Sequence, residues 1–137
     1  MSAGAEPAHH LLRTLAAVAP STRILLLGDD GRHLPPLRAM GFDVTEAPAS
    51  DAAHDWVVAW NSHDDGAALA SMLETARMAL APGGWVWVAT AGVDPDALQS
   101  GAAGAGLALA EAPAHDVIDG LPVVRAIFRR VDGGSVA

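Results

Sequence analysis

The chain has 137 residues, a length that suits one domain, and 51% of them are hydrophobic, so a core can form without metals or disulfides. It has no cysteine, which excludes thiol catalysis, and its net charge of −8 argues against nucleic acid and anionic membranes as partners. No apolar run reaches the roughly 18 residues that span a bilayer, and a signal-peptide pattern is lacking, so we expect a cytoplasmic protein without membrane contact.

Helical and extended patterns alternate along the first two thirds of the chain. Apolar side chains at helical spacing predict helices, and short aliphatic runs predict strands buried on both faces of a parallel sheet. Pro82, Gly83 and Gly84 are expected to separate the clearest helix from the next strand. The expected elements are a helix over 7–18, a strand over 23–28, a helix over 34–40 ended by Gly41, strands over 42–47 and 56–60, a helix over 64–80 capped by Ser62, and a strand over 85–90.

The last third of the chain predicts a helix and a hairpin. Asp94 and Pro95 suit the cap and first turn of a helix. Asp119-Gly120 is a strong turn signal between the extended stretch that ends at 118 and a returning strand over 121–130. Alternating elements followed by an antiparallel pair predict one α/β domain over residues 1–137, with flexible ends at 1–6 and 131–137.

Three stretches resemble parts of one enzyme superfamily, in the same order and at similar spacing. Residues 23–50 look like its first strand, glycine loop, first helix and second strand. Residues 55–62 look like its fourth strand, and residues 76–90 look like a helix, a Pro-Gly-Gly turn and its fifth strand. These segments resemble the class I SAM-dependent methyltransferases. The resemblance implies a three-layer Rossmann-like sheet, mostly parallel, with a C-terminal antiparallel hairpin.

The segments that hold SAM in this superfamily are altered here. The GxGxG loop corresponds to Gly28-Asp29-Asp30-Gly31, which is shorter and carries two carboxylates where glycine belongs. The acid that binds the ribose hydroxyls corresponds to Pro48, and Glu46 is the nearest substitute on the same face of the strand. The resemblance therefore marks vestigial SAM-site positions, which are Gly28, Asp29, Asp30, Gly31, Glu46 and Asn61.

A third departure from the superfamily is a deletion. Only about eight residues, Pro48 to Asp55, lie where the superfamily inserts a helix, a third strand and another connection. The acid that reads adenine normally follows that third strand. The sequence therefore predicts a sheet that lacks the third-strand unit, with no SAM cofactor and no methyl transfer. The alternative is a genuine small-molecule methyltransferase that binds SAM through an atypical loop.

Asp29, Asp30 and His33 follow the expected strand over 23–28, and the polar residues 61–65 follow the one over 56–60. These two strands are neighbours in the expected sheet. Ligands bind beyond the carboxyl ends of parallel strands, and imidazole with carboxylate suits zinc, manganese or iron. His33 or His63 would then be available as a general base. The interpretation we favour is simpler: Asp64 and Asp65 stabilise a helix N-terminus, and Asp29-Asp30 forms a solvated turn. We assign no metal and no catalytic residue; a metal- or small-ligand-binding alternative would use Asp30, His33, His63 and Asp64.

The four tryptophans lie in two expected strands, as two pairs that each share a face: Trp56 with Trp60, and Trp85 with Trp87. Core packing under the flanking helices is the simpler explanation for them. The missing third-strand unit, however, leaves sheet surface uncovered, and exposed apolar area usually marks a partner. We therefore expect a non-catalytic methyltransferase-like domain that acts through a homodimer or another protein partner. His9 and His10, on the N-terminal helix, are expected at the surface.

A further likeness concerns the segment that follows the third expected strand. Trp60 ends that strand, and the acidic stretch Asp64-Asp65-Gly66 follows it. This pattern is similar to small actinobacterial proteins with a methyltransferase-like core. It agrees with the superfamily resemblance and implies no particular activity.

Overall fold

The protein is described by a computed structural model that covers residues 10–19, 21–28, 33–46, 54–61, 66–118 and 120–130, without the side chains of 66–68. Helices and strands alternate along these residues before a C-terminal hairpin. The elements are α1 (His10–Leu15), β1 (Arg23–Leu27), α2 (Leu34–Ala39), β2 (Asp43–Thr45), β3 (His54–Asn61), α3 (Gly66–Ala79), β4 (Leu80–Thr90), α4 (Pro95–Gly104), β5 (Leu107–Ile118) and β6 (Leu121–Arg130).

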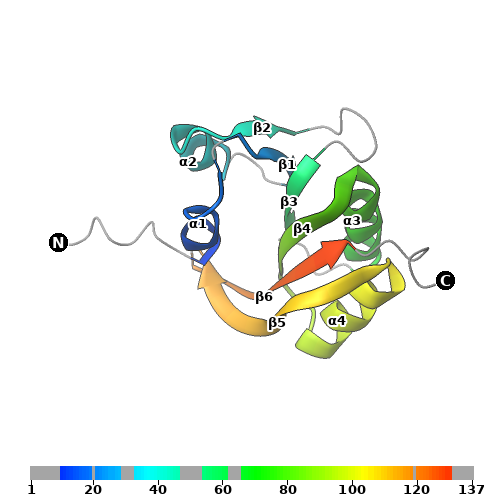
Figure 1. The fold of residues 1–137 in the computed structure, drawn as a ribbon. Helices are drawn as coiled ribbons and strands as arrows, with labels where there is room; N and C mark the ends of the chain where they lie inside the picture. The colour runs from blue at the N-terminus through cyan, green and yellow to red at the C-terminus, as the bar shows by residue number, and fades with distance from the viewer. Residues whose placement is uncertain are drawn as a thin grey trace.

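Six strands form one sheet in the order β2-β1-β3-β4-β6-β5. The first four are parallel, and the hairpin β5–β6 adds to β4 in antiparallel orientation (Figure 1). Among the described residues no strand flanks β2 on its outer side. β2 ends at Thr45 and β3 begins at His54, which leaves eight residues for the connection. This sheet confirms the predicted fold class, which is an α/β sheet that is mostly parallel and ends in an antiparallel hairpin.

Helices cover both faces of the sheet, and each face has its own core. α1 and α2 lie on one face, and α3 and α4 lie on the other (Figure 1). Leucines from α1 and α2 cover the tryptophans, whereas leucines and alanines of α3 and α4 pack against strand valines. The helix residues of the first core are Leu11, Leu15 and Leu37, and those of the second are Leu69, Leu73, Ala76, Ala79, Leu98 and Ala102.

The tryptophans gather on the α1/α2 face because β3 and β4 are neighbours. Trp56 lies opposite Trp85, and the two rings stack with centroids 5.8 Å apart. Trp60 and Trp87 are 1% and 0% exposed. Core packing, the simpler of the two explanations drawn from the sequence, is therefore confirmed for Trp56, Trp60 and Trp87, while Trp85 is partly buried against the same cluster.

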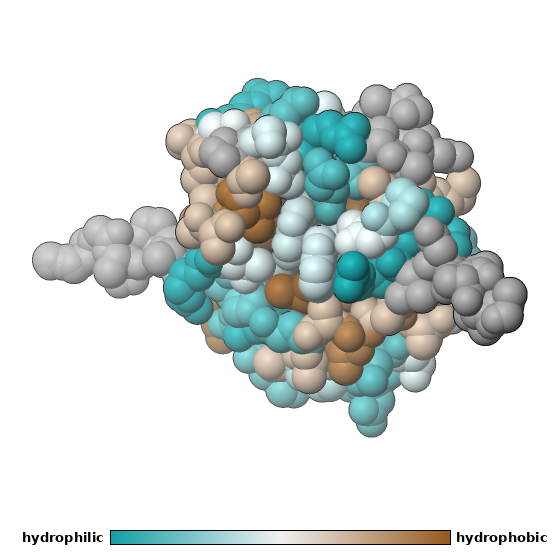
Figure 2. Space-filling view, viewed as in Figure 1, coloured by the Kyte–Doolittle hydropathy of each residue, from teal (hydrophilic) through white to brown (hydrophobic). Residues whose placement is uncertain are grey.

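The sheet edge at β2 is polar on the side where the third-strand unit is missing. Val44 points into the α1/α2 core, while Asp43 is exposed and Thr45 is partly exposed. The large apolar side chains that are exposed among the described residues lie elsewhere, at Met78, Leu109 and Val117. Figure 2 shows apolar residues on the visible face in patches separated by hydrophilic ones. The uncovered apolar face on which the homodimer expectation rests is therefore not found among the described residues.

β4 begins earlier than the sequence predicts. Leu80 to Gly84 belong to the strand, whereas we expected Pro82 to Gly84 to separate a helix from a strand that starts at Trp85. His54 pairs with Leu80 and Trp56 pairs with Trp85, so the extra residues of β4 form an irregular bulge. A bulge tolerates a proline and the positive φ of Gly83, which is +78°. α3 accordingly ends at Ala79, one residue before its predicted end, and α1 ends at Leu15 rather than at residue 18.

β5 is the edge strand of the hairpin, and its ladder with β6 is interrupted twice. The register shifts between Leu109 and Glu111 and again between Glu111 and Ala114. Each shift turns the following side chains to the other face of the sheet. Glu111 lies opposite Ile127 of the α1/α2 core, whereas His115 lies opposite Val124 of the α3/α4 core. The bulges thus allow one strand to supply polar side chains to both faces.

Candidate functional site

Gly28 follows β1 at the carboxyl edge of the sheet, where the glycine loop of the superfamily begins. Its φ is +69°, and a Cβ at this position would lie 2.3 Å from the carbonyl oxygen of Trp60. Any other residue would clash with the backbone of the neighbouring strand, so this position requires glycine. Asp29, Asp30 and Gly31, the rest of the predicted loop, lie outside the described residues.

Asn61 and Thr90 join the carboxyl ends of β3 and β4. The Asn61 Nδ2 donates to Thr90 Oγ1 at 3.1 Å, and the Asn61 carbonyl accepts from the Ala91 amide at 2.8 Å. The two side chains are 3% and 0% exposed. Asn61, predicted as a vestigial cofactor position, is therefore engaged in holding two strand ends together.

His33 lies in the core of the α1/α2 face. It is 1% exposed, and its ring contacts Trp60 and Trp87 edge-on, with centroids 5.5 Å and 5.9 Å apart. Its carbonyl accepts from the Leu37 amide and so helps to start α2. The sequence placed His33 at the crevice as a candidate ligand or base; burial between indoles does not support that role, because a ligand from solvent cannot reach the imidazole.

Glu46 directly follows β2 and is exposed. Pro48, which occupies the position of the ribose-binding acid, lies outside the described residues. The other metal candidates, Asp30, His63 and Asp64, lie outside them too. Within the part of the chain that the structure describes, no group of three or more His, Asp or Glu side chains is placed to hold a metal ion.

These positions show how far the described residues fit SAM. Gly28 keeps a glycine with positive φ where the cofactor loop of the superfamily begins, although the close approach seen there is to the Trp60 carbonyl of β3. Asn61, however, is bound to Thr90, and Glu46 stands at a sheet edge that has no outer neighbour among the described residues. The strand end that would face adenine has no counterpart in the described sheet. The described residues therefore do not fit SAM in the manner that the superfamily resemblance implies.

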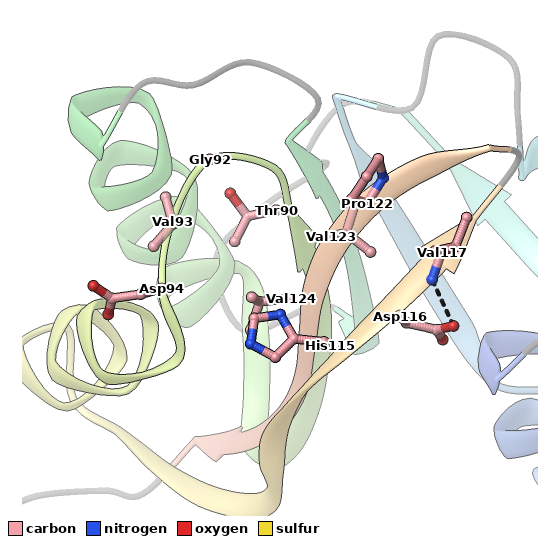
Figure 3. A pocket seen from close by; sticks show the side chains of 10 residues that line it. All are labelled: Thr90, Gly92, Val93, Asp94, His115, Asp116, Val117, Pro122, Val123 and Val124. Carbon is pink, nitrogen blue, oxygen red and sulfur yellow. Dashed lines mark hydrogen bonds between the residues drawn. The ribbon is translucent and has the colours of Figure 1, made fainter.

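A cavity lies beyond the carboxyl end of β4, between the start of α4 and the hairpin (Figure 3). Its volume is about 630 Å³, within the range of small-molecule sites. The φ of Gly92, +73°, turns the chain away from β4 toward α4. The lining residues are Thr90, Gly92, Val93, Asp94, His115, Asp116, Val117, Pro122, Val123 and Val124.

The polar groups of this cavity come from α4 and β5. Asp94 is the N-cap of α4, and its Oδ1 accepts from the Ala97 amide at 2.7 Å. The sequence predicted that capping role, which is confirmed. Figure 3 shows the His115 ring directed from β5 into the space between the hairpin and α4. No motif in the sequence singles out His115, because the bulges that set its direction have no local sequence signal.

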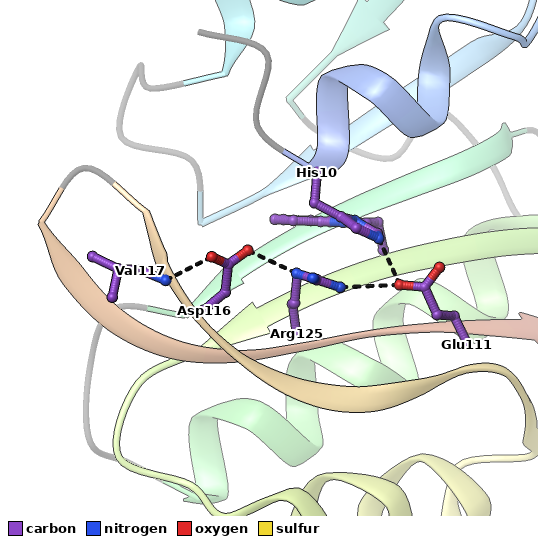
Figure 4. A network of polar contacts seen from close by, with 6 residues as sticks. His10, Glu111, Asp116, Val117 and Arg125 are labelled. Carbon is purple, nitrogen blue, oxygen red and sulfur yellow. Dashed lines mark hydrogen bonds and ion pairs between the residues drawn. The ribbon is translucent and has the colours of Figure 1, made fainter. Parts of the chain in front are cut away.

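A second polar group joins α1 to the hairpin on the opposite face. The Trp87 Nε1 donates to His10 Nδ1 at 3.0 Å, and His10 Nε2 lies 2.5 Å from a Glu111 oxygen. Arg125 bridges Glu111 and Asp116, at 3.0 Å and 2.7 Å (Figure 4). The His10 side chain is only 14% exposed, so its predicted surface position is wrong. Its partner Glu111 lies about a hundred residues away, beyond any local pattern.

The titratable groups with shifted pKa values lie away from the carboxyl edge of β1 and β3. Burial, and then the nearby Arg23, lower the pKa of His54. Burial by itself raises the pKa of Asp55 and of Asp116, but hydrogen bonds from Arg23 and Arg125 respectively outweigh it and leave both pKa values below the usual one. Perturbed groups often mark functional sites, but these belong to ion pairs and to a buried strand end.

Comparisons with known proteins place the fold. No protein-family model and no curated protein sequence matches the chain. A TehB-like SAM-dependent methyltransferase from Corynebacterium glutamicum has 17% identity over 86% of this chain and 85% of that chain, with a TM-score of 0.63. A complex between the Haloferax volcanii Trm112 methyltransferase activator and a methyltransferase gives 15% identity over 88% of both chains, with a TM-score of 0.62.

A third similar structure carries the demethylated form of the cofactor. It is the Burkholderia thailandensis 1,6-didemethyltoxoflavin-N1-methyltransferase with bound S-adenosylhomocysteine, with 14% identity over 82% of this chain and 72% of that chain, and a TM-score of 0.61. At such identities the likeness concerns the fold. The chain therefore has the class I SAM-dependent methyltransferase fold that the sequence resemblance predicts. The structure also contains no described helix that is long and apolar enough to cross a membrane.

Proposed function

We propose that this chain is a methyltransferase-fold binding domain that does not transfer methyl groups. The observation that carries the proposal is the sheet order at its outer edge, where eight residues connect β2 directly to β3. Eight residues are too few for a further helix, strand and connection, since a helix averages about eleven residues and a strand about five. The adenine side of a SAM site would therefore have no supporting strand.

Two other departures support the same proposal. Pro48 replaces the ribose-binding acid, and a proline side chain cannot accept a hydrogen bond. Gly28-Asp29-Asp30-Gly31 adds carboxylates where the amino-acid end of SAM would approach, and the carboxylate of SAM is repelled by them. Each change weakens the binding of one part of SAM, so the three together leave little free energy for binding the whole molecule.

The proposal is tested by titrating SAM and S-adenosylhomocysteine into the full chain calorimetrically, with an established SAM-binding methyltransferase as positive control. We expect no binding in the micromolar range. Pro48→Asp, which restores one acid, should leave the result unchanged, because the other two losses remain. Micromolar binding by the wild-type chain would overturn the proposal, and micromolar binding by Pro48→Asp would show that the losses do not act together.

We extend the proposal to a protein partner, either a second copy of this chain or another protein. The assembly of one similar structure with an activator protein supports it. Light scattering on a size-exclusion column tests the second copy. A dimer mass is expected, and a strictly monomeric chain would contradict the homodimer.

A second candidate function is true methyl transfer. Gly28 favours it, because a glycine with positive φ follows β1 at the position where the superfamily's cofactor loop begins. The SAM titration above decides between the two, since a methyltransferase must bind SAM. If SAM binds, Gly28→Ala should abolish binding, because the added Cβ meets the Trp60 carbonyl.

A further inference from the structure

The cavity between α4 and the hairpin combines an apolar wall with one prominent carboxylate. Val93, Val117 and Pro122 line it, and Val117 is 63% exposed, more than the other exposed large apolar residues of the described chain. An exposed valine on the wall of a cavity retains unfavourable apolar contact with water, which a bound ligand would remove. The apolar wall therefore favours a ligand with a hydrocarbon or aromatic body.

The charges at the cavity favour a cation over an anion. Asp116 belongs to the lining, but its carboxylate accepts from Arg125 on the other face of the sheet. Asp94 also belongs to the lining. One of its oxygens caps α4, and no ion pair between Asp94 and a cation is found among the described residues. No arginine lines the cavity, and the chain carries a net charge of −8. The carboxylates of Asp94 and Asp116 repel an anionic ligand, and the one at Asp94 already offsets the positive end of the α4 dipole.

Asp94 also lies where two hollows meet. Gly92, Val93 and Asp94 line a second hollow of about 380 Å³ between α3 and α4, next to the first. The carboxylate is exposed, so it is accessible to a ligand in either hollow. Figure 3 shows the His115 ring directed from β5 into the first hollow, where an imidazole nitrogen can accept a hydrogen bond.

We propose that this cavity binds a small organic amine, with its apolar body against Val93, Val117 and Pro122 and its ammonium group at Asp94. The site lies apart from the vestigial SAM positions: none of Gly28, Glu46 and Asn61 lines it. The inference therefore holds whether or not SAM binds, and amine binding does not depend on S-adenosylhomocysteine.

The test is an NMR titration of the full, isotope-labelled chain with three probes that share a phenethyl body: phenethylamine, 2-phenylethanol and 3-phenylpropionate. With about nine non-hydrogen atoms, phenethylamine should bind with a Kd of roughly 1–10 mM. We expect it to shift the amide signals of Gly92, Val93 and Val117. The neutral alcohol should bind more weakly at the same place, and the anion should not bind.

Asp94→Asn separates the charge of Asp94 from its structural role, since asparagine caps helices as well as aspartate does. This variant should raise the Kd for phenethylamine about fivefold and leave the Kd for 2-phenylethanol unchanged. Asp96→Asn, in the same first turn but outside the cavity, is the matched control and should change neither. The proposal is overturned if phenethylamine leaves these amides unshifted, if Asp94→Asn binds it as tightly as the wild type, or if the anion binds equally well.

Discussion

The two faces of the sheet are covered by helices of different length and by side chains of different size. On one face, two six-residue helices cover the four tryptophans, and the imidazoles of His10 and His33 pack among the indoles. On the other face, helices of 14 and 10 residues pack through leucine and alanine onto strand valines. Short helices leave space that only large side chains fill, whereas small side chains let long helices approach closely. The first face should be sensitive to lost volume and the second to added volume.

The largest effect is expected from removing an indole. Trp87→Ala should lower the free energy of unfolding by about 3–5 kcal/mol, because Trp87 is fully buried and the short helices cannot close the cavity. Urea unfolding measures the change, and Trp87→Phe provides a variant that retains most of the volume. Met78→Ala, on the other face and 54% exposed, is the control and should change stability by less than about 0.5 kcal/mol. Equal losses for Trp87→Ala and Met78→Ala would contradict the comparison.

The next effect concerns added volume on the α3/α4 face. Ala102→Leu should destabilise the chain by about 1–3 kcal/mol, because Ala102 is 0% exposed where α4 meets the sheet. Ala103→Leu places the same side chain at an exposed position of the same helix and should alter stability by less than about 0.5 kcal/mol. If Ala102→Leu is tolerated equally well, the close packing inferred for this face is wrong.

A smaller effect tests whether polar contacts hold α1 on the tryptophan face. His10→Leu and Trp87→Phe each remove one partner of the 3.0 Å hydrogen bond. A double-mutant cycle should give a coupling of about 1 kcal/mol, the usual contribution of a hydrogen bond of this kind. Additive losses in the cycle would mean that the hydrogen bond between Trp87 and His10 does not help to hold α1 on this face.

The smallest effect is a dependence of stability on pH. Burial lowers the pKa of His54 in the folded chain, so the unfolded chain binds a proton at higher pH than the folded one. Stability should therefore fall as the pH drops below about 6.5, until the lowered pKa is reached. His54→Gln should reduce this slope, because it removes the group whose pKa burial lowers. An unaltered slope in His54→Gln would show that another group is responsible.

Local sequence patterns predicted the helices and strands, but they did not predict the contacts between elements that are distant in the sequence. The run from Arg23 to Leu27 and the Asp94-Pro95 cap carry their structure in a few adjacent residues, and both were predicted. The start of β4 at Leu80 was missed, because Pro82 and the glycines indicate a break and the pairing with His54 cannot be read locally. The sequence thus yields the strand order through resemblance, but not the register.

The candidate site shows the same division. Gly28 was marked by the resemblance of its segment to a cofactor loop, and the structure gives it a positive φ beside β3 that restricts the position to glycine. His33 was expected at the crevice, but the packing of three aromatic rings places it in the core. His115 and the cavity around it depend on two bulges in β5, and bulges have no strong sequence signature.

The irregular ladder of β5 also affects how chains can meet one another at high concentration. An unpaired strand edge is a template for stacking identical chains into fibrils, and this edge carries the exposed apolar residues Leu109 and Val117. Two register shifts bend the edge, and Pro113 removes an amide donor from it. A second β5 cannot lie flat along such an edge. We therefore expect β5, the strand that lines the amine cavity, to disfavour cross-β stacking of identical chains as well.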